Sequence, residues 1–193
     1  MPPKVRISTE EIIDAGIELV RNNGIASVNA RDLAKSLQCS IQPVFRNFHS
    51  MDNLKHDLYK RTELIFDDHM KRGMEVHAIP FLGLGLAYIE FAKKEKNLFQ
   101  FLFMSDDFKG RSVFDMMMDE ENQQVVEMIA GATGLDQARA EDLFLSIWIM
   151  THGIASMAAT DNSVFTQQQT EKILMDAFCG LKHQYKTAQE ENK

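Results

Sequence analysis

Cysteine is nearly absent from this sequence. Cys39 and Cys179 are the two cysteines among 193 residues, and they lie far apart. Neither belongs to a group with metal-ligand spacing, and two distant cysteines do not make a disulfide framework. We therefore expect no zinc site and no structural disulfide, as is usual in a reducing compartment.

Long apolar runs and strand patterns are missing as well. No stretch reaches the roughly 18 apolar residues that a membrane span needs. The first residues, MPPKVRIS, hold no apolar signal segment. No segment alternates like a strand, and no internal repeat is present. We expect an all-α protein of the cytoplasm that does not enter a membrane.

The sequence also lacks the common catalytic motifs. It has no GxSxG, no HExxH, no Cys/His pair at useful spacing and no Glu-x-x-His pair of a di-iron bundle. Gly83-Leu84-Gly85 is not a nucleotide loop, because no strand precedes it and no third glycine follows at position 88. We expect no catalytic residues, no metal and no cofactor.

An excess of positive charge is missing from the chain as a whole, which has a net charge of -7. The acidity is uneven, however. Residues 1–60 carry eight Lys or Arg and seven acids, whereas residues 61–193 carry 13 Lys or Arg and 21 acids. The first region, at +1, is therefore the part suited to a polyanion, with an affinity that should weaken at high salt.

The most informative stretch is Ile25–Leu54, which reads as two short helices and the start of a third. Asn29 is placed to cap the first helix, with Asp32 three residues later. Gln38-Cys39-Ser40 forms a turn, and Ser40 is expected to cap the second helix. Pro43 then falls in the first turn, where a missing N–H costs little.

The second short helix has two different faces. Val44 and Phe48 are four residues apart and are expected to point inward. Ile41, Gln42, Phe45, Arg46 and Asn47 are then left facing outward. Two short helices across a tight turn, the second with an outward polar and basic face, are typical of a helix-turn-helix that reads DNA.

Helical spacing extends along the rest of the chain, for about nine helices in all. Ser8 opens a capping box, Ser50 and Asp136 are further expected caps, and Gly24 is an expected helix end. The expected later helices are 50–71, 80–94, 98–104, 111–130, 136–159 and one starting after Thr166–Gln169. We expect a break at residues 73–79 and a frayed tail from Thr187.

Residues 8–60 resemble the N-terminal domain of the tetracycline-repressor-like (TetR) family of bacterial transcription regulators. The matching residues are Ile12 through Gly24, Asn29 to Ala34, Leu37, Val44 to Phe48 and Ser50 to Leu54. Two positions depart from the family pattern. Phe45 stands where the family usually has Tyr, and Met51 where it usually has Lys, both usual phosphate contacts.

The resemblance implies a helix-turn-helix domain at residues 1–53 and a helical effector-binding and dimerisation domain at 54–193. Trp148, His152 and Gly153 are similar to a subgroup whose C-terminal domain contains a Trp-His-Gly motif. The implied partners are a palindromic operator in double-stranded DNA, a small hydrophobic or amphipathic effector, and a second copy of the chain. The implied function is a ligand-responsive regulator, expected to be a repressor.

The expected DNA contacts combine base readers with phosphate contacts. Gln42 can pair with adenine, Arg46 with guanine, and Ile41 can pack on a thymine methyl. Arg31 and His49 are suited to phosphates. The full candidate set is Arg31, Ser40, Ile41, Gln42, Pro43, Phe45, Arg46, Asn47 and His49. On residues alone, solvated side chains of an ordinary helical domain are an equal alternative.

The second domain is rich in Met and Phe, which suits an adaptable apolar pocket but equally an ordinary core. The candidate ligand-binding residues are Ile65, Phe66, His69, Tyr88, Phe91, Phe103, Met117, Met118, Trp148, Thr151 and His152. A histidine such as His152, taken alone, is more often a packed, hydrogen-bonded residue than a ligand contact.

The last two helices carry apolar surface in excess of what one chain needs. Residues 143–150 are apolar almost all the way round, which indicates burial on two sides. We expect an isologous dimer through a four-helix bundle. Its candidate residues are Ile147, Met150, Ile154, Ile173, Leu174, Ala177, Phe178 and Leu181. A dimeric ligand-binding protein that has lost operator binding is the main alternative, because of Phe45 and Met51.

Overall fold

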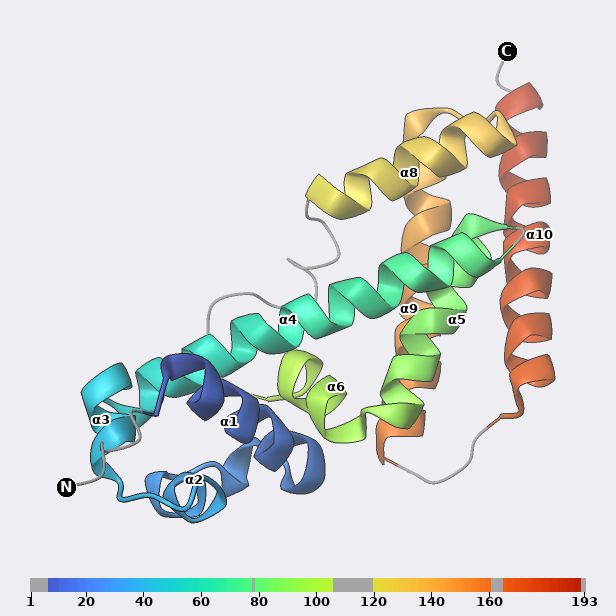
Figure 1. The fold of residues 1–193 in the computed structure, drawn as a ribbon. Coiled ribbons are helices and arrows are strands. Elements are labelled where there is room, and N and C mark those ends of the chain that lie inside the picture. The colour runs from blue at the N-terminus through green and yellow to red at the C-terminus, as the bar shows by residue number, and fades with distance from the viewer. Residues whose placement is uncertain (1–6, 78, 106–119, 161–164, 192–193) are drawn as a thin grey trace. The chain divides into compact units, whose positions relative to one another are not determined.

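The computed structural model describes residues 7–77, 79–105, 120–160 and 165–191. These residues form nine α-helices and one 3-10 turn and contain no strand, which confirms the all-α prediction (Figure 1). The helices are α1 (Thr9–Asn23), α2 (Ala30–Ser36), α3 (Gln42–Phe48), α4 (Met51–Val76), α5 (Pro80–Lys94), α6 (Lys96–Phe103), α8 (Glu120–Thr133), α9 (Gln137–Thr160) and α10 (Gln167–Glu191), with the 3-10 turn at Ile25–Ser27.

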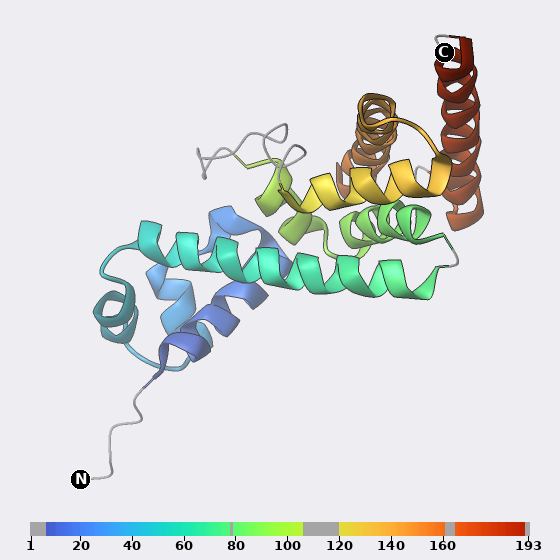
Figure 2. The same ribbon diagram turned by 90° about the horizontal axis from the view of Figure 1, so that it is seen from above.

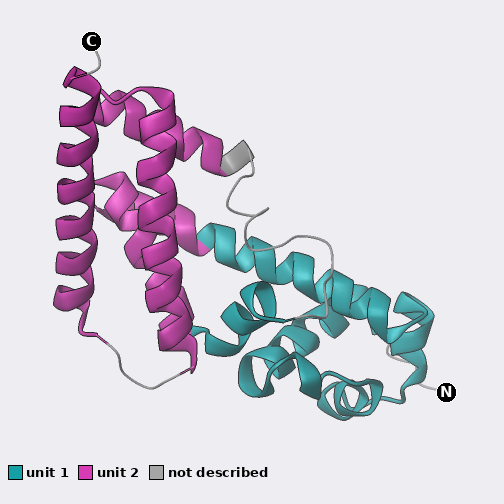
Figure 3. Cartoon of the chain, turned by 180° about the vertical axis from the view of Figure 1, so that it is seen from behind, with its two compact units in different colours: residues 1–68, 95–108 teal, residues 69–94, 109–193 magenta. Residues whose placement is uncertain are grey.

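The contacts divide the chain into two compact units (Figure 3). Unit 1 comprises residues 1–68 and 95–108, and unit 2 comprises residues 69–94 and 109–193. Helix α4 therefore begins in unit 1 and ends in unit 2, and α6 belongs to unit 1 although it follows α5. The division into a helix-turn-helix domain at 1–53 and an effector-binding and dimerisation domain at 54–193 assigns functions to the two ranges, and it stays a prediction.

Helix α1 begins at the predicted capping box. The Ser8 hydroxyl accepts from the Glu11 N–H, and the Glu11 carboxylate accepts from the Ser8 N–H at 2.7 Å. This backbone hydrogen bond, followed by the one from the Ser8 hydroxyl, lowers the pKa of Glu11. The helix ends at Gly24, whose φ of 77° lies in the left-handed region that glycine tolerates. Both ends of α1 are therefore where the sequence predicted them.

Helix α2 begins at Asn29 as expected. The Asn29 side-chain oxygen accepts from the N–H groups of Arg31 and Asp32, each at 3.0 Å. Asp32 accepts from the Asn29 side-chain amide at 2.6 Å, and not from the backbone N–H that the capping-box pattern suggested. Asn29 and Asp32 are thus hydrogen-bonded to each other at the start of the helix-turn-helix.

The start of α3 differs from the prediction. Its N-cap is Ile41, with φ -69° and ψ -15° and no side-chain cap, so Ser40 does not cap it. Ile41 already has helical dihedral angles, which leaves Ser40 too far back to reach the first free N–H groups. Pro43 does lie in the first turn, and Val44 and Phe48 are buried as predicted. Ser50 caps α4 by accepting from the Asn53 N–H at 3.1 Å.

Polar side chains tie α6 to the end of α1 within unit 1. The Arg21 Nε donates to Glu95 at 2.9 Å. Asn97 donates its side-chain amide to the Arg21 carbonyl at 2.8 Å, satisfying a carbonyl that the helix end leaves free. Arg61 of α4 pairs with Glu10 and Asp14 of α1. Helices α4 and α6 are therefore both tied to α1 by polar side chains.

Helix α9 is the centre of unit 2. It packs against α5, α8 and α10 (Figures 1 and 2). Leu143, Phe144 and Ile147 of α9 join Val126 and Ile129 of α8 in one apolar cluster. By length and composition α9 alone, among the described residues, is long and apolar enough to cross a membrane, yet it is a packed core helix here.

The predicted break at residues 73–79 begins too early, because α4 continues through Gly73 to Val76. Gly73 lies against α5, where a Cβ atom on it would be 2.2 Å from the Cβ of Ala87. A Cβ on Gly83 would be 2.5 Å from the Gly73 carbonyl oxygen. Gly73 and Gly83 therefore allow α4 and α5 to pack closely. This role of Gly83 agrees with the prediction that Gly83-Leu84-Gly85 is not a nucleotide loop.

The last two helices begin at their predicted caps. Asp136 accepts from the Arg139 N–H at 3.0 Å, and this hydrogen bond lowers its pKa. Thr166 and Gln169 exchange hydrogen bonds of 2.9 and 3.2 Å. The predicted frayed tail is wrong, because α10 continues to Glu191. Gln189 accepts from the Asp136 N–H and donates to the Gly134 carbonyl, which fixes the end of the helix.

Candidate nucleic-acid interface and ligand pocket

Helix α3 presents the predicted polar face to solvent. Its side chains at Gln42, Phe45 and Arg46 are exposed, and Phe48 on the opposite face is 3% exposed. Ser40, Ile41, His49 and Arg31 are also exposed, and Pro43 and Asn47 are half-buried. Seven of the nine residues that the sequence predicted for DNA are thus exposed, and their role in DNA binding stays a prediction.

Asn47 differs from the other candidates because its amide has partners within the fold. It donates to the Pro43 carbonyl at 2.8 Å and accepts from the Thr9 hydroxyl at 3.3 Å. The second contact joins α3 to the start of α1. The geometry therefore gives Asn47 a part in positioning the helix, and its role as a base reader stays a prediction.

The turn between α2 and α3 is compact. Gln38 lies in this turn and has a φ of 50°, and His49 directly follows α3 and has a φ of 66°. Few non-glycine residues adopt this left-handed region. Lys35, in the last turn of α2, is exposed and adds a cation that the sequence analysis did not include. Its place in the sequence, next to the predicted turn, could have identified Lys35 as a candidate DNA contact. This arrangement can place a short helix against a polyanion.

Four of the candidate ligand residues meet between α5 and α9. The Tyr88 hydroxyl and the His152 Nδ1 are hydrogen-bonded at 2.9 Å. Trp148 stacks on His152 with 5.0 Å between ring centroids and 7° between planes. Burial lowers the pKa of His152 below its ordinary 6.5 and raises that of Tyr88 well above its ordinary value. Thr151, also buried, lies beside Gly85.

The remaining candidates do not join this cluster. Phe66 packs on Phe103 at 5.2 Å in unit 1, where Ile65 also belongs. His69 lies in unit 2, 5.5 Å from the Phe91 ring, and donates from Nε2 to the Ala87 carbonyl at 3.0 Å. Met117 and Met118 lie outside the described residues. The predicted set therefore does not surround one described cavity.

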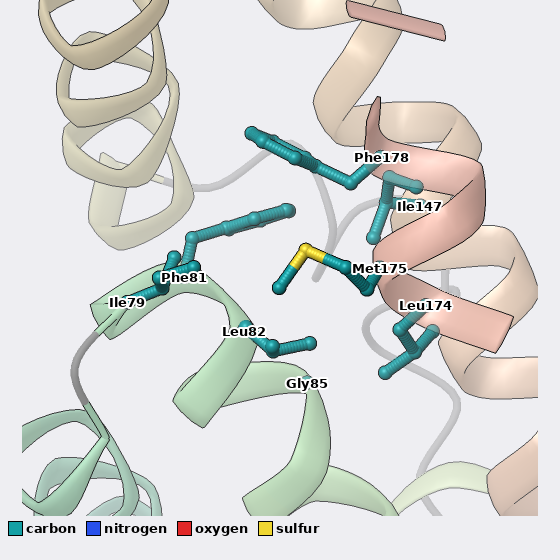
Figure 4. Close-up of a pocket in the computed structure, with 8 residues that line it drawn as sticks. All are labelled: Ile79, Phe81, Leu82, Gly85, Ile147, Leu174, Met175 and Phe178. Carbon is teal, nitrogen blue, oxygen red and sulfur yellow. The ribbon is translucent and has the colours of Figure 1, made fainter. Parts of the chain in front are cut away.

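A pocket does exist in unit 2, between α5, α9 and α10 (Figure 4). Its free volume is about 20 Å³, room for roughly one water molecule, so a larger ligand enters only if the lining side chains move. Figure 4 shows the Met175 side chain pointing between Phe81 and Leu82. The lining is wholly apolar and consists of Ile79, Phe81, Leu82, Gly85, Ile147, Leu174, Met175 and Phe178. None of these was a predicted ligand residue; Ile147, Leu174 and Phe178 were predicted for the dimer interface, and Ile79 for a break between helices.

Three of the predicted dimer residues are covered by the chain's own helices. Ile147, Ile154 and Leu174 are buried within unit 2, so the chain's own helices already account for their burial. Met150, Ile173, Ala177, Phe178 and Leu181 are half-buried and still accessible in part. The sequence could not separate the two sides of an all-apolar helix, because periodicity is absent there.

The outer face of α9 carries apolar surface that the sequence analysis did not single out. Ile149 is 58% exposed, and Met157 is exposed two turns later. Gly153 lies between them, with nothing within 4 Å of a Cβ atom built on it. Spacing of four residues places all three on one side of the helix.

A family model described as tetracyclin repressor-like, C-terminal domain, matches residues 81–177. The chain belongs to the tetracyclin repressor-like (TetR) family. This family consists of transcriptional regulators, which in general are not enzymes. The description of the model mentions no Trp-His-Gly motif, so the subgroup stays a prediction. No curated protein matches the chain.

Solved structures share the TetR fold. A TetR-like transcriptional regulator from Rhodococcus sp. RHA1 is 13% identical and has a TM-score of 0.63, with 92% of this chain and 96% of that one covered. A protein with unknown function from the same source is 18% identical and has a TM-score of 0.69, with 96% and 99% covered. At such low identity these likenesses show the fold alone.

Proposed function

We propose that this TetR-family protein is a homodimeric regulator that binds a palindromic operator and blocks transcription until a small, mostly apolar effector releases it. The observation that carries the proposal is the exposed face of α3. Gln42 and Arg46 point to solvent, and the buried Val44 and Phe48 hold the helix from behind. A helix presented in this way fits the major groove.

DNA selection with the full chain tests the operator step. Duplexes bound from a random library should contain inverted half-sites, roughly one helical turn apart or slightly more. Arg46→Ala should weaken binding to such a duplex by roughly 1–3 kcal/mol if Arg46 reads a base. Lys172→Ala, an exposed cation of unit 2, is the control and should leave binding unchanged. Recovery of no preferred sequence would refute operator recognition.

The effector is proposed to enter the apolar pocket between α5, α9 and α10. Its lining offers no charged group, so the ligand must bring a hydrophobic portion without charge. The Met175 thioether can move aside, since methionine adapts readily to different shapes. A ligand releases DNA only by its difference in affinity between two conformers. Helix α4 is continuous between the units and is the proposed link.

Fluorescence provides the effector test, because Trp148 is the single tryptophan and adjoins the pocket residue Ile147. Compounds from an apolar library should change Trp148 emission, and the same compounds should weaken binding to the selected duplex. Met175→Phe should fill the pocket and reduce both effects. Met128→Phe, at an exposed position of α8 outside the pocket lining and the proposed dimer face, is the control. Compounds that leave emission and DNA binding unchanged would count against this site.

The dimer is proposed to form through the outer face of α9 and the half-buried residues of α10. Exposed Ile149 and Met157 are apolar surface that a second copy would cover. Light scattering after size exclusion should give twice the chain mass, and Ile149→Lys should shift the protein toward the monomer. A monomeric wild-type protein at micromolar concentration would contradict this part.

The second candidate function is a dimeric ligand-binding protein without operator binding. Phe45 favours it, because a phenyl ring cannot donate the phosphate hydrogen bond of the family's usual tyrosine. The two candidates differ in one result. Ligand binding without any selected duplex would support the second candidate.

A further inference from the structure

The exposed side of α3 contains two parallel rows of side chains. Ile41 and Phe45 are four residues apart, as are Gln42 and Arg46. Residues four apart lie on the same helix face. The helical dihedral angles of Ile41 extend this geometry to the N-cap position. The helix therefore carries one apolar row beside one polar row.

The apolar row is not needed to build the core. Ile41 is 44% exposed and Phe45 is 41% exposed, while Val44 and Phe48 supply the buried side of the same helix. A single exposed apolar residue is common, but two large ones in register form a small patch. Such a patch indicates contact with something outside the unit.

The surroundings of the patch indicate what covers it. Exposed cations at Arg31, Lys35 and Arg46 lie on α2 and α3, which suits a partner with a regular array of phosphates. The apolar group that base edges expose in the major groove is the thymine C5 methyl. A phenyl ring has no hydrogen-bonding atom, so the direct contribution of Phe45 must be apolar.

Asn47, the other amide of α3, is engaged by Pro43 and Thr9. That leaves Gln42 and Arg46 as the polar side chains of the helix that point outward without a described partner in the fold. The apolar row is consequently a large share of the surface that α3 can offer to base edges.

We propose that Ile41 and Phe45 read thymine methyl groups, so that each operator half-site must carry thymines at the positions facing this row. Gln42 and Arg46 then fix the neighbouring base pairs by hydrogen bonds. This inference rests on the proposed function, since it requires an operator. It departs from the usual family contact, in which an aromatic hydroxyl meets a phosphate.

Replacing thymine by deoxyuridine tests the inference directly. The probe is a duplex selected from a random library by the full chain, with deoxyuridine placed at one thymine position of each half-site at a time. Deoxyuridine keeps every hydrogen-bonding group and removes only the methyl. At the contacted positions binding should weaken about fourfold for each buried methyl, by the usual value for burying a methylene-sized group.

Matched variants assign the contact to its side chain. In Phe45→Ala the penalty for deoxyuridine should disappear at one position, and in Ile41→Ala at another. Leu64→Ala is the control, because Leu64 is 64% exposed on α4 of the same unit. That variant should keep the full penalty. Circular dichroism and urea unfolding of each variant exclude loss of folding as the cause.

The outcomes separate this inference from the proposed function. Tight binding that is unchanged within twofold by deoxyuridine at every thymine overturns the inference and leaves operator binding intact. A penalty that persists in both alanine variants also overturns it. Selection that yields no duplex overturns both together.

Discussion

Unit 1 and unit 2 hold their helices together in different ways. In unit 1, charged and amide side chains join separate helices, as Arg61 does with Glu10 and Arg21 with Glu95. In unit 2, α4 and α5 meet at glycines, where a Cβ atom on Gly73 or Gly83 would clash with the facing helix. Aromatic pairs occur in both units, as Phe66 with Phe103 in unit 1 and Phe81 with Phe178 in unit 2. The longest helices of unit 2, α9 and α10, span 24 and 25 residues, whereas α2 and α3 span seven each.

This difference matches the tasks proposed for the two units. Short helices bury little apolar surface, so their orientation depends on caps and polar links that are directional. A reading helix needs a fixed orientation and a free outer face. Long apolar helices are held together by the hydrophobic effect, which has no preferred direction. The packing between such helices can therefore adjust around a ligand. Local polar geometry is therefore critical in unit 1, and volume is critical in unit 2.

The largest expected effect is the loss of the apolar anchor behind α3. Phe48→Ala should lower the free energy of unfolding by about 3–5 kcal/mol, since it leaves a cavity in a small core. Phe45→Ala, three residues earlier and exposed, should change it by less than about 0.5 kcal/mol. Urea unfolding followed by circular dichroism measures both. Similar losses in the two variants would show that α3 is not anchored as described.

Gly73→Ala is expected to have the next largest effect, in unit 2. The new methyl would meet Ala87 and force α4 and α5 apart, which should cost about 1–3 kcal/mol. Gly131→Ala in α8 is the matched control, with nothing within 4 Å of the added methyl, and should stabilise the chain by about 0.5–1 kcal/mol. If Gly73→Ala also stabilises the chain in urea unfolding, packing volume is not critical in unit 2.

Removing a cap compares the two units directly. Asn29→Ala and Asp136→Ala each remove a side chain that accepts from backbone N–H groups, and each should cost about 1 kcal/mol. Only Asn29→Ala should also weaken DNA binding, because it loosens the helix before the turn. Binding to a selected duplex, measured by fluorescence anisotropy, distinguishes them. Equal losses of DNA binding would contradict the proposed separation of tasks.

The smallest expected effect is the pH dependence that arises from His152. Its pKa is lowered in the folded protein by burial, so the unfolded chain binds a proton first as the pH falls. The contribution of neutral His152 to the free energy of unfolding is fully present above about pH 7. It decreases as the pH falls below that, until the pH is lower than the pKa of His152 in the folded protein. His152→Gln should therefore flatten the loss of stability between pH 7 and pH 5 in urea unfolding. An unchanged slope would show that another group is responsible.

The predictions that came true depend on neighbours in the chain. Ser8, Asn29 and Ser50 cap their helices because a cap needs only backbone N–H groups two or three residues away. Val44 and Phe48 were assigned to the inner face from helical periodicity, which is equally local. The fold class and most of the exposed side of α3 could therefore be predicted, with Asn47, which bonds to Pro43 and Thr9, as the exception.

Apart from Ser40, whose role as a cap is lost locally at Ile41, the errors occurred where distant segments decide. Gly73 was taken for a helix break because the sequence does not show Ala87 and Gly83 packing against it. The end of α10 was taken for a frayed tail, although Gln189 bonds to Asp136 and Gly134. The pocket was missed because Phe81, Leu82 and Met175 differ in no local way from other core residues.

The sequence by itself determined that this chain is helical, where most helices begin, and which side of α3 faces solvent. These properties follow from hydrogen bonds and periodicities that span a few residues. Only the tertiary structure decided which apolar side chains are core, which line the pocket and which remain on the outer face of α9. Burial is a property of all the segments that meet at a point, and Ile147 and Ile149 differ only in what packs against them.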